Sequence, residues 1–407
     1  MKFFKDKYYG EVWSPEKPEC KSFCVLEILN NEIYLHTNLI SENSNYNIEI
    51  IYGVFNELGS LTFVNCIVHS IQTGIIEYKK YNPLYVFSSI YETINPVGLR
   101  LKKIEVDNDT ISDLIRTLHI VNPLNNIVEI ESIKTHEIVV NNNLVISIHK
   151  NYGISSSKLG INIFNKGIIN FEFTKEKTVL ESIEIYKKFQ KFCIIYFSGI
   201  KRFNSFKSYS LNCNKSYNII FDDILETKHH QGLFNEELLK DNYIFEKVIR
   251  NWYNNENISY CFDIIIENYL SKKVSNARRL TNSISSFEAF YKLFSKNKNK
   301  DLDKRIIEYE NIFNRIDQNV DDIASYAKKI VRIRDYYVHG NRKQDVEHDD
   351  FDLLYFSLLL DFVVIRELSK ELGYNDKYLE IIERKSFMFL EYQQPFNKNF
   401  KNNNIIE

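Results

Sequence analysis

The chain has 407 residues, of which 44% are hydrophobic and 26% charged, a composition that excludes a disordered protein and suffices for two or three domains with cores. Its 52 Lys and Arg against 54 Asp and Glu leave a formal net charge of −2, so any attraction to nucleic acid must come from a local basic face. The N-terminus is charged and does not resemble a signal peptide, and the sequence has no run of about 18 apolar residues that could span a membrane. We therefore expect a soluble cytoplasmic protein.

The first half of the chain has the pattern of strands. From Lys21 to about Phe173, short β-branched and aromatic runs are separated by Asn and Gly. The predicted strands cover residues 23–28, 32–37, 46–53, 60–71, 136–140, 143–150, 160–164 and 168–173. The Asn-rich stretch before Leu144 predicts a hairpin turn. This half is therefore expected to be mostly β.

A single helix is expected after these strands. Thr178 and Glu181 have the spacing of a capping box, and apolar residues then recur at helical intervals to Phe189. The run "KFCIIYFSGI", residues 191–200, predicts a return to strand.

The pattern becomes helical after "KHHQGLFNEE" and stays so. Candidate helices cover residues 236–252, 257–272, 276–296, 303–316, 319–339, 347–371 and 376–390. We therefore predict an α+β multidomain protein with a domain boundary near Gly232. The β-rich region covers residues 1–232, which a split near residue 125 would divide into two subdomains, and the all-α domain covers residues 233–407.

The six cysteines are scattered and include no Cys-x-x-Cys pair and no matching His spacing. They are Cys20, Cys24, Cys66, Cys193, Cys213 and Cys261. We expect reduced thiols, with no metal site and no cofactor.

The stretch "RIRDYYVHGNRK", residues 332–343, contains the residues most suggestive of chemistry. Three arginine–histidine matches occur in and just after it: Arg334 with His339, Arg332 with His339, and Arg342 with His348. Apolar residues recur at helical spacing in this helix: Ile323, Ala327, Ile330 and Tyr337. Arg334 falls on this stripe, whereas Arg332 points elsewhere. The last match crosses a Gly-Asn turn into the acidic stretch "DVEHDDFD", which is better explained as a solvated helix start.

An arginine on an apolar face requires a partner, because burial of an unpaired charge is costly. Arg334 could pair with a core carboxylate, or it could turn towards a subunit interface or a cleft. His339 lies in the last helical turn, where the helix dipole favours its protonated form, and Asp335 four residues earlier could orient its ring. Such an imidazole could act as an acid or base near neutral pH.

The pattern Arg334-Asp335-x-x-x-His339, followed by the long apolar helix "FDLLYFSLLLDFVVIREL", resembles that of HEPN domains, which include metal-independent endoribonucleases. The earlier helix "SISSFEAFYKLF" carries Glu288, which resembles the acidic residue of these domains and is the carboxylate we would pair with a buried arginine.

The N-terminal stretches "YYGEVWSPE" and "IIYGVFNELGSLTFVNC" are similar to the start of ApeA proteins, bacterial anti-phage systems in which such a domain precedes a HEPN domain. The resemblance implies a metal-independent endoribonuclease acting by abortive infection. In it, a ribose 2′-OH attacks the adjacent phosphate, with His339 as general base or acid and Arg334 stabilising the developing charge.

The expected partners are RNA and a second copy of the chain, and the resemblance also allows a phage-derived trigger at the N-terminal region. Candidate RNA contacts are Lys272, Lys273, Arg278, Arg279 and the "KNKNK" segment. Two alternatives remain open: a non-catalytic HEPN module that binds nucleotide or protein, and a β-rich region that senses a ligand or phage component.

Overall fold

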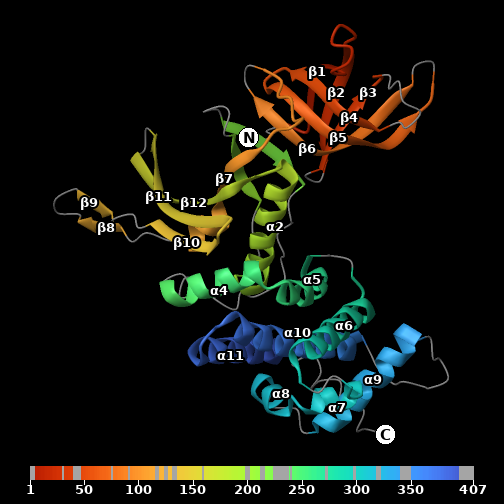
Figure 1. Ribbon diagram of the computed structural model, residues 1–407, viewed down its shortest axis with the longest axis vertical. Helices are drawn as coiled ribbons and strands as arrows, with labels where there is room; N and C mark the ends of the chain where they lie inside the picture. The colour runs from red at the N-terminus through yellow and green to blue at the C-terminus, as the bar shows by residue number, and fades with distance from the viewer. Residues whose placement is uncertain are drawn as a thin grey trace. The chain divides into compact units, whose positions relative to one another are not determined.

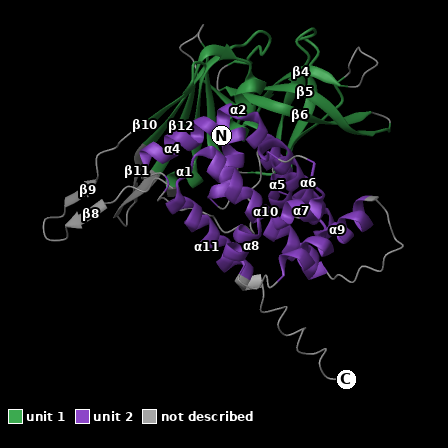
Figure 2. Cartoon of the chain, turned by 60° about the horizontal axis from the view of Figure 1, so that its bottom comes forward, with its two compact units in different colours: residues 1–187, 201–224 green, residues 188–200, 225–407 purple. Residues whose placement is uncertain are grey.

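A computed structural model describes residues 5–29, 32–39, 47–74, 77–89, 92–114, 119–122, 127–130, 135–157, 160–197, 202–210, 216–222, 238, 241–270, 274–296, 299–317, 322–339 and 350–393. The chain forms two compact units: unit 1 comprises residues 1–187 and 201–224, and unit 2 comprises residues 188–200 and 225–407 (Figure 2). The predicted domain boundary near Gly232 and the split near residue 125 both lie outside the described residues.

Unit 1 is β-rich, as predicted. Its described strands include a 12-stranded antiparallel sheet with the order β10-β11-β12-β7-β13-β14-β6-β3-β2-β1-β4-β5 (Figure 1). The strands are β1 (Lys7–Trp13), β2 (Ser22–Leu29), β3 (Glu32–Thr37), β4 (Ile48–Phe55), β5 (Gly59–Gln72), β6 (Tyr78–Ser89), β7 (Leu101–Asn108), β10 (Thr135–Asn141), β11 (Leu144–Ser157), β12 (Gly160–Lys177), β13 (Phe203–Ser210) and β14 (Ser216–Phe221). A separate pair is formed by β8 (His119–Asn122) and β9 (Ile127–Ile130), and the short helix α1 (Asp109–Leu114) follows β7.

The first six strands close into a ring. β6 pairs with β5 as well as with β3 and β14, so that the order β1-β2-β3-β6-β5-β4 returns to β1. Alternate residues point inward and form an apolar core that includes Val12, Leu26, Leu35, Phe63 and Tyr81. Buried and more exposed residues alternate clearly along β1, and this alternation places Lys7, Tyr9, Glu11 and Trp13 on its outward side.

Two glycines permit the close approach of β1 and β4. A Cβ on Gly10 would lie 2.3 Å from the carbonyl oxygen of Val54, and one on Gly53 would lie 2.8 Å from the ring of Phe55. Both positions belong to the stretches that carry the N-terminal resemblance. Packing of the closed ring therefore accounts for glycine at these positions.

Helix α2 (Val179–Tyr196) corrects one prediction. Its capping box forms as expected, because Glu181 N donates to Thr178 Oγ1 at 3.2 Å and Thr178 N donates to Glu181 Oε2 at 2.8 Å. Residues 191–196, however, continue the helix instead of forming a strand. Every residue from Phe192 to Tyr196 is fully buried, so this part lacks the polar face that distinguishes a helix from a strand in sequence.

The two ends of α2 belong to different units. In unit 1, Tyr186 contacts an aromatic cluster formed by Phe171, Phe203, Phe206 and Phe221. In unit 2, Phe192 packs on Trp252 with ring centroids 5.5 Å apart, and Tyr196 contacts Tyr374 at 5.3 Å. The last turns of α2 therefore form part of the core of the helical unit.

Unit 2 is helical, as predicted. Its described helices are α4 (Asn242–Asn254), α5 (Glu256–Leu270), α6 (Asn276–Phe294), α7 (Leu302–Ile307), α8 (Glu310–Ile316), α9 (Ile323–His339), α10 (Asp350–Leu372) and α11 (Asp376–Gln393). The predicted helix 303–316 is two short helices, separated at Glu308 and Tyr309. The apolar helix α10 lies at the centre and contacts α4, α5, α6, α8 and α11. None of the described helices is long and apolar enough to span a membrane.

Candidate active site

Helix α9 holds Arg334 at the edge of its buried face. Ile323, Ala327, Ile330 and Ile333 are buried, whereas Arg332 is exposed. The side chain of Arg334 is 27% exposed, so its guanidinium is partly shielded and still reaches solvent. Tyr337 was predicted to continue the apolar stripe, but it is 41% exposed. Ile333, one turn earlier, is the last buried residue among those described on α9.

The guanidinium of Arg334 pairs with the carboxylate of Glu288 on α6. Nη2 of Arg334 donates to Oε1 at 3.2 Å and to Oε2 at 3.4 Å. This is the carboxylate expected from the sequence. The side chain of Glu288 is 29% exposed, so the pair lies at the boundary between core and solvent. Its contribution to stability is therefore small, and its main effect is to orient the guanidinium.

A second arginine also faces Glu288. Nη1 of Arg305, at the end of α7, lies 3.8 Å from Oε1 of Glu288. Arg305 is held in turn by a 2.6 Å hydrogen bond from its Nε to the carbonyl of Lys300 and by the ring of Tyr291, 5.2 Å from its guanidinium carbon. No sequence motif identified Arg305, because only the packing of α7 beside α9 and the ion pair with Glu288 of α6 show its role.

Asp335 adds a second carboxylate on the other side of Arg334. Its Oδ1 lies 3.6 Å from Nη1 of Arg334, and its side chain is 39% exposed. The two arginines and two carboxylates together have no net charge, so any excess of positive charge for a phosphate must come from elsewhere. His339 is the last residue of α9, and its side chain lies outside the described part of the structure, as do Arg342 and His348.

The structure describes some of the remaining candidate RNA contacts and not others. Lys272 and Lys273 lie outside the described residues. Arg278 is exposed and pairs with Glu267 at 3.4 Å, while the carbonyl oxygen of Arg279 accepts hydrogen bonds from Asn268 and Ser283. Of the "KNKNK" segment, Lys300 pairs with Glu308. These contacts partly neutralise the basic charge that the sequence suggested.

A buried carboxylate in unit 2 was not anticipated. Asp361 lies on α10 and is 1% exposed, and Asn268 Nδ2 donates to its Oδ2 at 3.2 Å. Asn268 also donates to Ser283, whose hydroxyl lies 2.8 Å from that of Ser357. Burial raises the pKa of Asp361 to about 7, against the hydrogen bonds of Ser283 and Asn268. The one signal in the sequence is an aspartate within the apolar run "FSLLLDFVVI".

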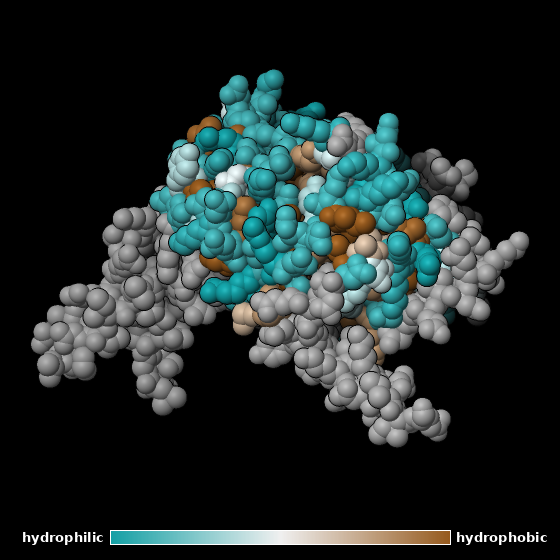
Figure 3. All heavy atoms as spheres, turned by 90° about the horizontal axis from the view of Figure 1, so that it is seen from below, coloured by the Kyte–Doolittle hydropathy of each residue, from teal (hydrophilic) through white to brown (hydrophobic). Residues whose placement is uncertain are grey.

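Exposed hydrophobic side chains lie near the ends of α9 and α10. Val338 is 48% exposed and Phe351 is 43% exposed. Figure 3 shows small hydrophobic patches among the hydrophilic side chains on one side of the described surface. Such patches are common on protein surfaces, and a contact between subunits is one use for them.

A pocket of about 570 Å³ opens at one end of the closed ring in unit 1. It lies where β1 and β3 end and where β2 and β4 begin, and its lining combines apolar, amide and charged side chains, among them Leu39, Ile50, Asn38, Asn47 and Lys21. Its volume and mixed lining suit a small ligand.

Two family models match the chain. The model described as ApeA N-terminal domain 1 matches residues 7–252, and the model described as Apea-like HEPN matches residues 230–378. The second match contains Glu288, Arg305, Arg334, Asp335 and His339. No curated protein and no solved structure matches the chain.

Proposed function

The chain belongs to the ApeA family and contains an ApeA-like HEPN domain, and on this premise we propose that it is a metal-independent endoribonuclease of bacterial anti-phage defence. The observation that supports this most directly is the half-buried Arg334, oriented by Glu288 on the helix that ends in His339. An arginine held in one orientation and still open to solvent is suited to bind a phosphate.

The proposed reaction is an internal transfer within the RNA. The 2′-OH of a ribose attacks the phosphorus of its own 3′-phosphate, and the bond from phosphorus to the 5′-oxygen of the next nucleotide breaks. His339 accepts the proton of the 2′-OH or donates a proton to the leaving oxygen. Arg334 stabilises the negative charge that builds on the phosphate oxygens. The products are a 2′,3′-cyclic phosphate and a 5′-OH.

A symmetric dimer would supply both an acid and a base. One histidine cannot act as base and acid in the same step, and two copies of α9 facing each other across a two-fold axis would provide two. The exposed Val338 in the last turn of α9 is suited to such a contact.

The chemistry is tested on purified full-length protein with a defined RNA oligonucleotide in EDTA. We expect cleavage to continue, to leave 2′,3′-cyclic phosphate and 5′-OH ends, and to spare DNA, which lacks the nucleophile. A 2′-deoxy substitution at the cut site should stop cleavage, while the same substitution one nucleotide away should not. Products with 5′-phosphate ends, or activity that is lost in EDTA and restored by magnesium, would refute the proposal.

A second function is supported by the pocket in unit 1. Its volume of about 570 Å³ favours a β-rich region that senses a ligand or phage component, with a helical unit that need not be catalytic. In that case, Lys17→Glu and Asn38→Leu in the pocket would abolish defence against phage, whereas Arg334→Ala would not. If Arg334→Ala lost defence while Lys17→Glu and Asn38→Leu kept it, the nuclease would be favoured.

A further inference from the structure

We propose that the outer face of the closed ring in unit 1 binds single-stranded nucleic acid, by stacking bases on aromatic rings and by pairing phosphates with lysines. We call this surface the ring face. It extends over β4, β1, β2, β3 and β6. Its aromatic residues are Tyr9, Trp13, Phe23 and Tyr52, and its basic residues are Lys7, Lys21, His36 and Lys80.

Two of the aromatic side chains are exposed, and the other two are half-buried. Tyr9 and Phe23 are 53% and 54% exposed, and their rings lie stacked with centroids 6.3 Å apart. On the same side of β1 and β4, Trp13 and Tyr52 have centroids 6.4 Å apart. Large apolar side chains that face solvent together mark a binding surface, because leaving them in water is unfavourable.

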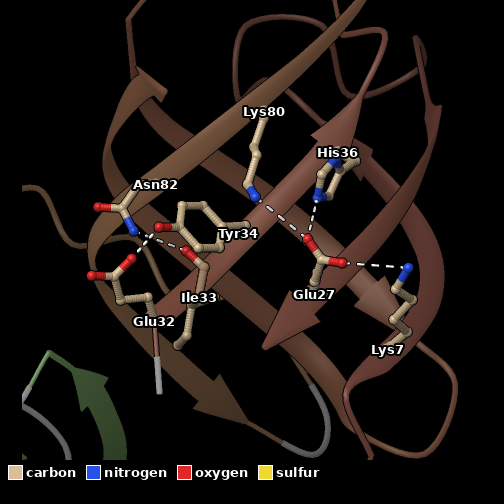
Figure 4. A network of polar contacts seen from close by, with 8 residues as sticks. All are labelled: Lys7, Glu27, Glu32, Ile33, Tyr34, His36, Lys80 and Asn82. Carbon is tan, nitrogen blue, oxygen red and sulfur yellow. Dashed lines mark hydrogen bonds and ion pairs between the residues drawn. The ribbon is translucent and has the colours of Figure 1, made fainter. Parts of the chain in front are cut away.

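Two lysines and a histidine converge on one carboxylate, Glu27, as Figure 4 shows. Glu27 lies 2.9 Å from Nε2 of His36, 3.3 Å from Nζ of Lys7 and 3.4 Å from Nζ of Lys80. The ammonium of Lys80 also lies 3.8 Å from the ring centroid of Tyr34. Glu27 thus faces two lysines and a histidine, and Glu32, a second carboxylate on the same side of β3, accepts a hydrogen bond from the hydroxyl of Tyr34.

The other end of the ring face has a similar arrangement. Lys21 lies 5.2 Å from the ring centroid of Trp13 and 3.5 Å from Glu11. Over the described part of this surface, the three lysines Lys7, Lys21 and Lys80 are balanced by the three carboxylates Glu11, Glu27 and Glu32, and a protonated His36 adds one positive charge.

The strand register sets the distances between the rings and the basic side chains. Lys7 and Tyr9 are two residues apart on β1, which places them about 7 Å apart on the same side. Tyr9, Val25, His36 and Lys80 are successive partners across four strands, a distance of about 14 Å. This surface is large enough for a few nucleotides of an extended strand.

The composition favours single-stranded nucleic acid over a protein partner or a duplex. Protein interfaces are enriched in arginine and depleted in lysine, whereas the charged donors here are lysines and a histidine. A duplex hides the faces of its bases, and exposed rings can stack only on bases that are free. The ring face does not depend on the proposed cleavage reaction.

Binding is tested on the full-length protein by fluorescence anisotropy with two labelled probes, an oligo(dT) and a 2′-O-methyl oligo(U). Neither has a free 2′-OH, so neither can be consumed by the proposed reaction. We expect binding that weakens with salt, with a log–log slope of about 0.7 for each phosphate contacted. The double variant Tyr9→Ala/Phe23→Ala should weaken binding roughly tenfold or more. Lys7→Gln/Lys80→Gln should weaken it and reduce the salt slope.

The matched control replaces two exposed tyrosines of unit 2, Tyr243→Ala and Tyr260→Ala, which should leave binding unchanged. Circular dichroism should confirm that each variant is folded. Full affinity in the Tyr9→Ala/Phe23→Ala variant, or no binding of either probe at low salt, would overturn the proposal. Loss of defence in that variant without any binding of nucleic acid would instead indicate a protein partner.

Discussion

Glu288 faces Arg334 with both carboxylate oxygens, at 3.2 Å and 3.4 Å from the same guanidinium nitrogen. This relationship joins α6 to α9 at the solvent boundary. It leads to a prediction that distinguishes the orientation of the Arg334 guanidinium from the stability of the fold.

Replacement of Glu288 by Gln should reduce RNA cleavage about tenfold or more while changing the free energy of unfolding by less than about 1 kcal/mol. The reason is that a half-exposed ion pair contributes little to stability, whereas a misplaced catalytic group slows the reaction strongly. Urea unfolding and single-turnover cleavage measure the two quantities. Glu246→Gln, which removes the exposed pair with Arg250 on α4, is the control and should change neither. Equal activity of Glu288→Gln and wild type would show that this pairing is only structural.

Arg334→Ala and His339→Ala should each abolish RNA cleavage and any growth arrest without unfolding the protein, since Arg334 is 27% exposed and His339 is the last residue of α9. Arg342→Ala and His348→Ala should have much smaller effects. Full activity in His339→Ala, or an equal loss in His348→Ala, would mean that another arginine–histidine pair does the chemistry.

Arg305→Ala should lower cleavage less than Arg334→Ala does, because Arg305 touches Glu288 at the longer distance of 3.8 Å and acts through it. The expected loss is in kcat with an unchanged KM, and Arg305→Lys should recover part of it. A change in KM alone would indicate that Arg305 contacts RNA directly.

The protein should be a dimer with α9 near its two-fold axis, and Val338→Asp should convert it to a monomer that no longer cuts RNA. A buried aspartate at the contact would disfavour association, and separate copies of α9 could not combine their catalytic groups. Light scattering measures the mass. Met388→Asp, at an equally exposed site on α11, should leave the dimer intact. A monomeric wild-type protein with full activity would exclude the composite site.

Asp361 should make the protein less stable as pH rises. Its pKa of about 7 in the folded protein exceeds its ordinary value, so the folded state keeps a proton that the unfolded state loses. The free energy of unfolding should therefore fall between about pH 4 and pH 7, by at most about 1.4 kcal/mol per pH unit, and then remain constant.

Asp361→Asn should remove this part of the pH dependence, because its amide oxygen can still accept the hydrogen bond from Asn268 without carrying a charge. Urea unfolding of both proteins from about pH 5 to pH 8 measures the difference. Nearby groups, among them Arg279 and Tyr269, are the same in both proteins and cancel in the comparison. Parallel curves would contradict the prediction.

Strands and helices could be predicted from the sequence where one face of the element is polar and the other apolar. The strand at residues 32–37 and the helix from residue 276 alternate in this way, and the structure has both. The end of α2 does not alternate, because Phe192 to Tyr196 are buried on all sides. Strands β1, β6, β7, β8, β9, β13 and β14 were missed; of these, β1 and β6 close the ring, and β7, β13 and β14 continue it into the larger sheet.

The candidate site was predictable to the extent that it follows helical spacing. Arg334 and Glu288 could be paired from sequence because Arg334 falls on the apolar stripe of its helix and Glu288 lies among apolar neighbours. Arg305 and Asp361 could not, because their contacts join segments that no periodicity relates. The ring face was hidden for a similar reason: Lys7, His36 and Lys80 are far apart in sequence and meet only through strand pairing.

The single helix Val179–Tyr196 has a consequence for how such a protein can be divided or recombined. Phe192 and Tyr196 precede the predicted helical domain by about 40 residues, yet they pack on Trp252 and Tyr374, and the Tyr196 hydroxyl lies 2.9 Å from that of Ser369. A gene fragment that begins at residue 233 would encode a bundle without part of its own core. An exchange of modules at residue 233 would join the bundle to the α2 of a relative, so the residues that contact Phe192 and Tyr196 would have to fit that foreign helix.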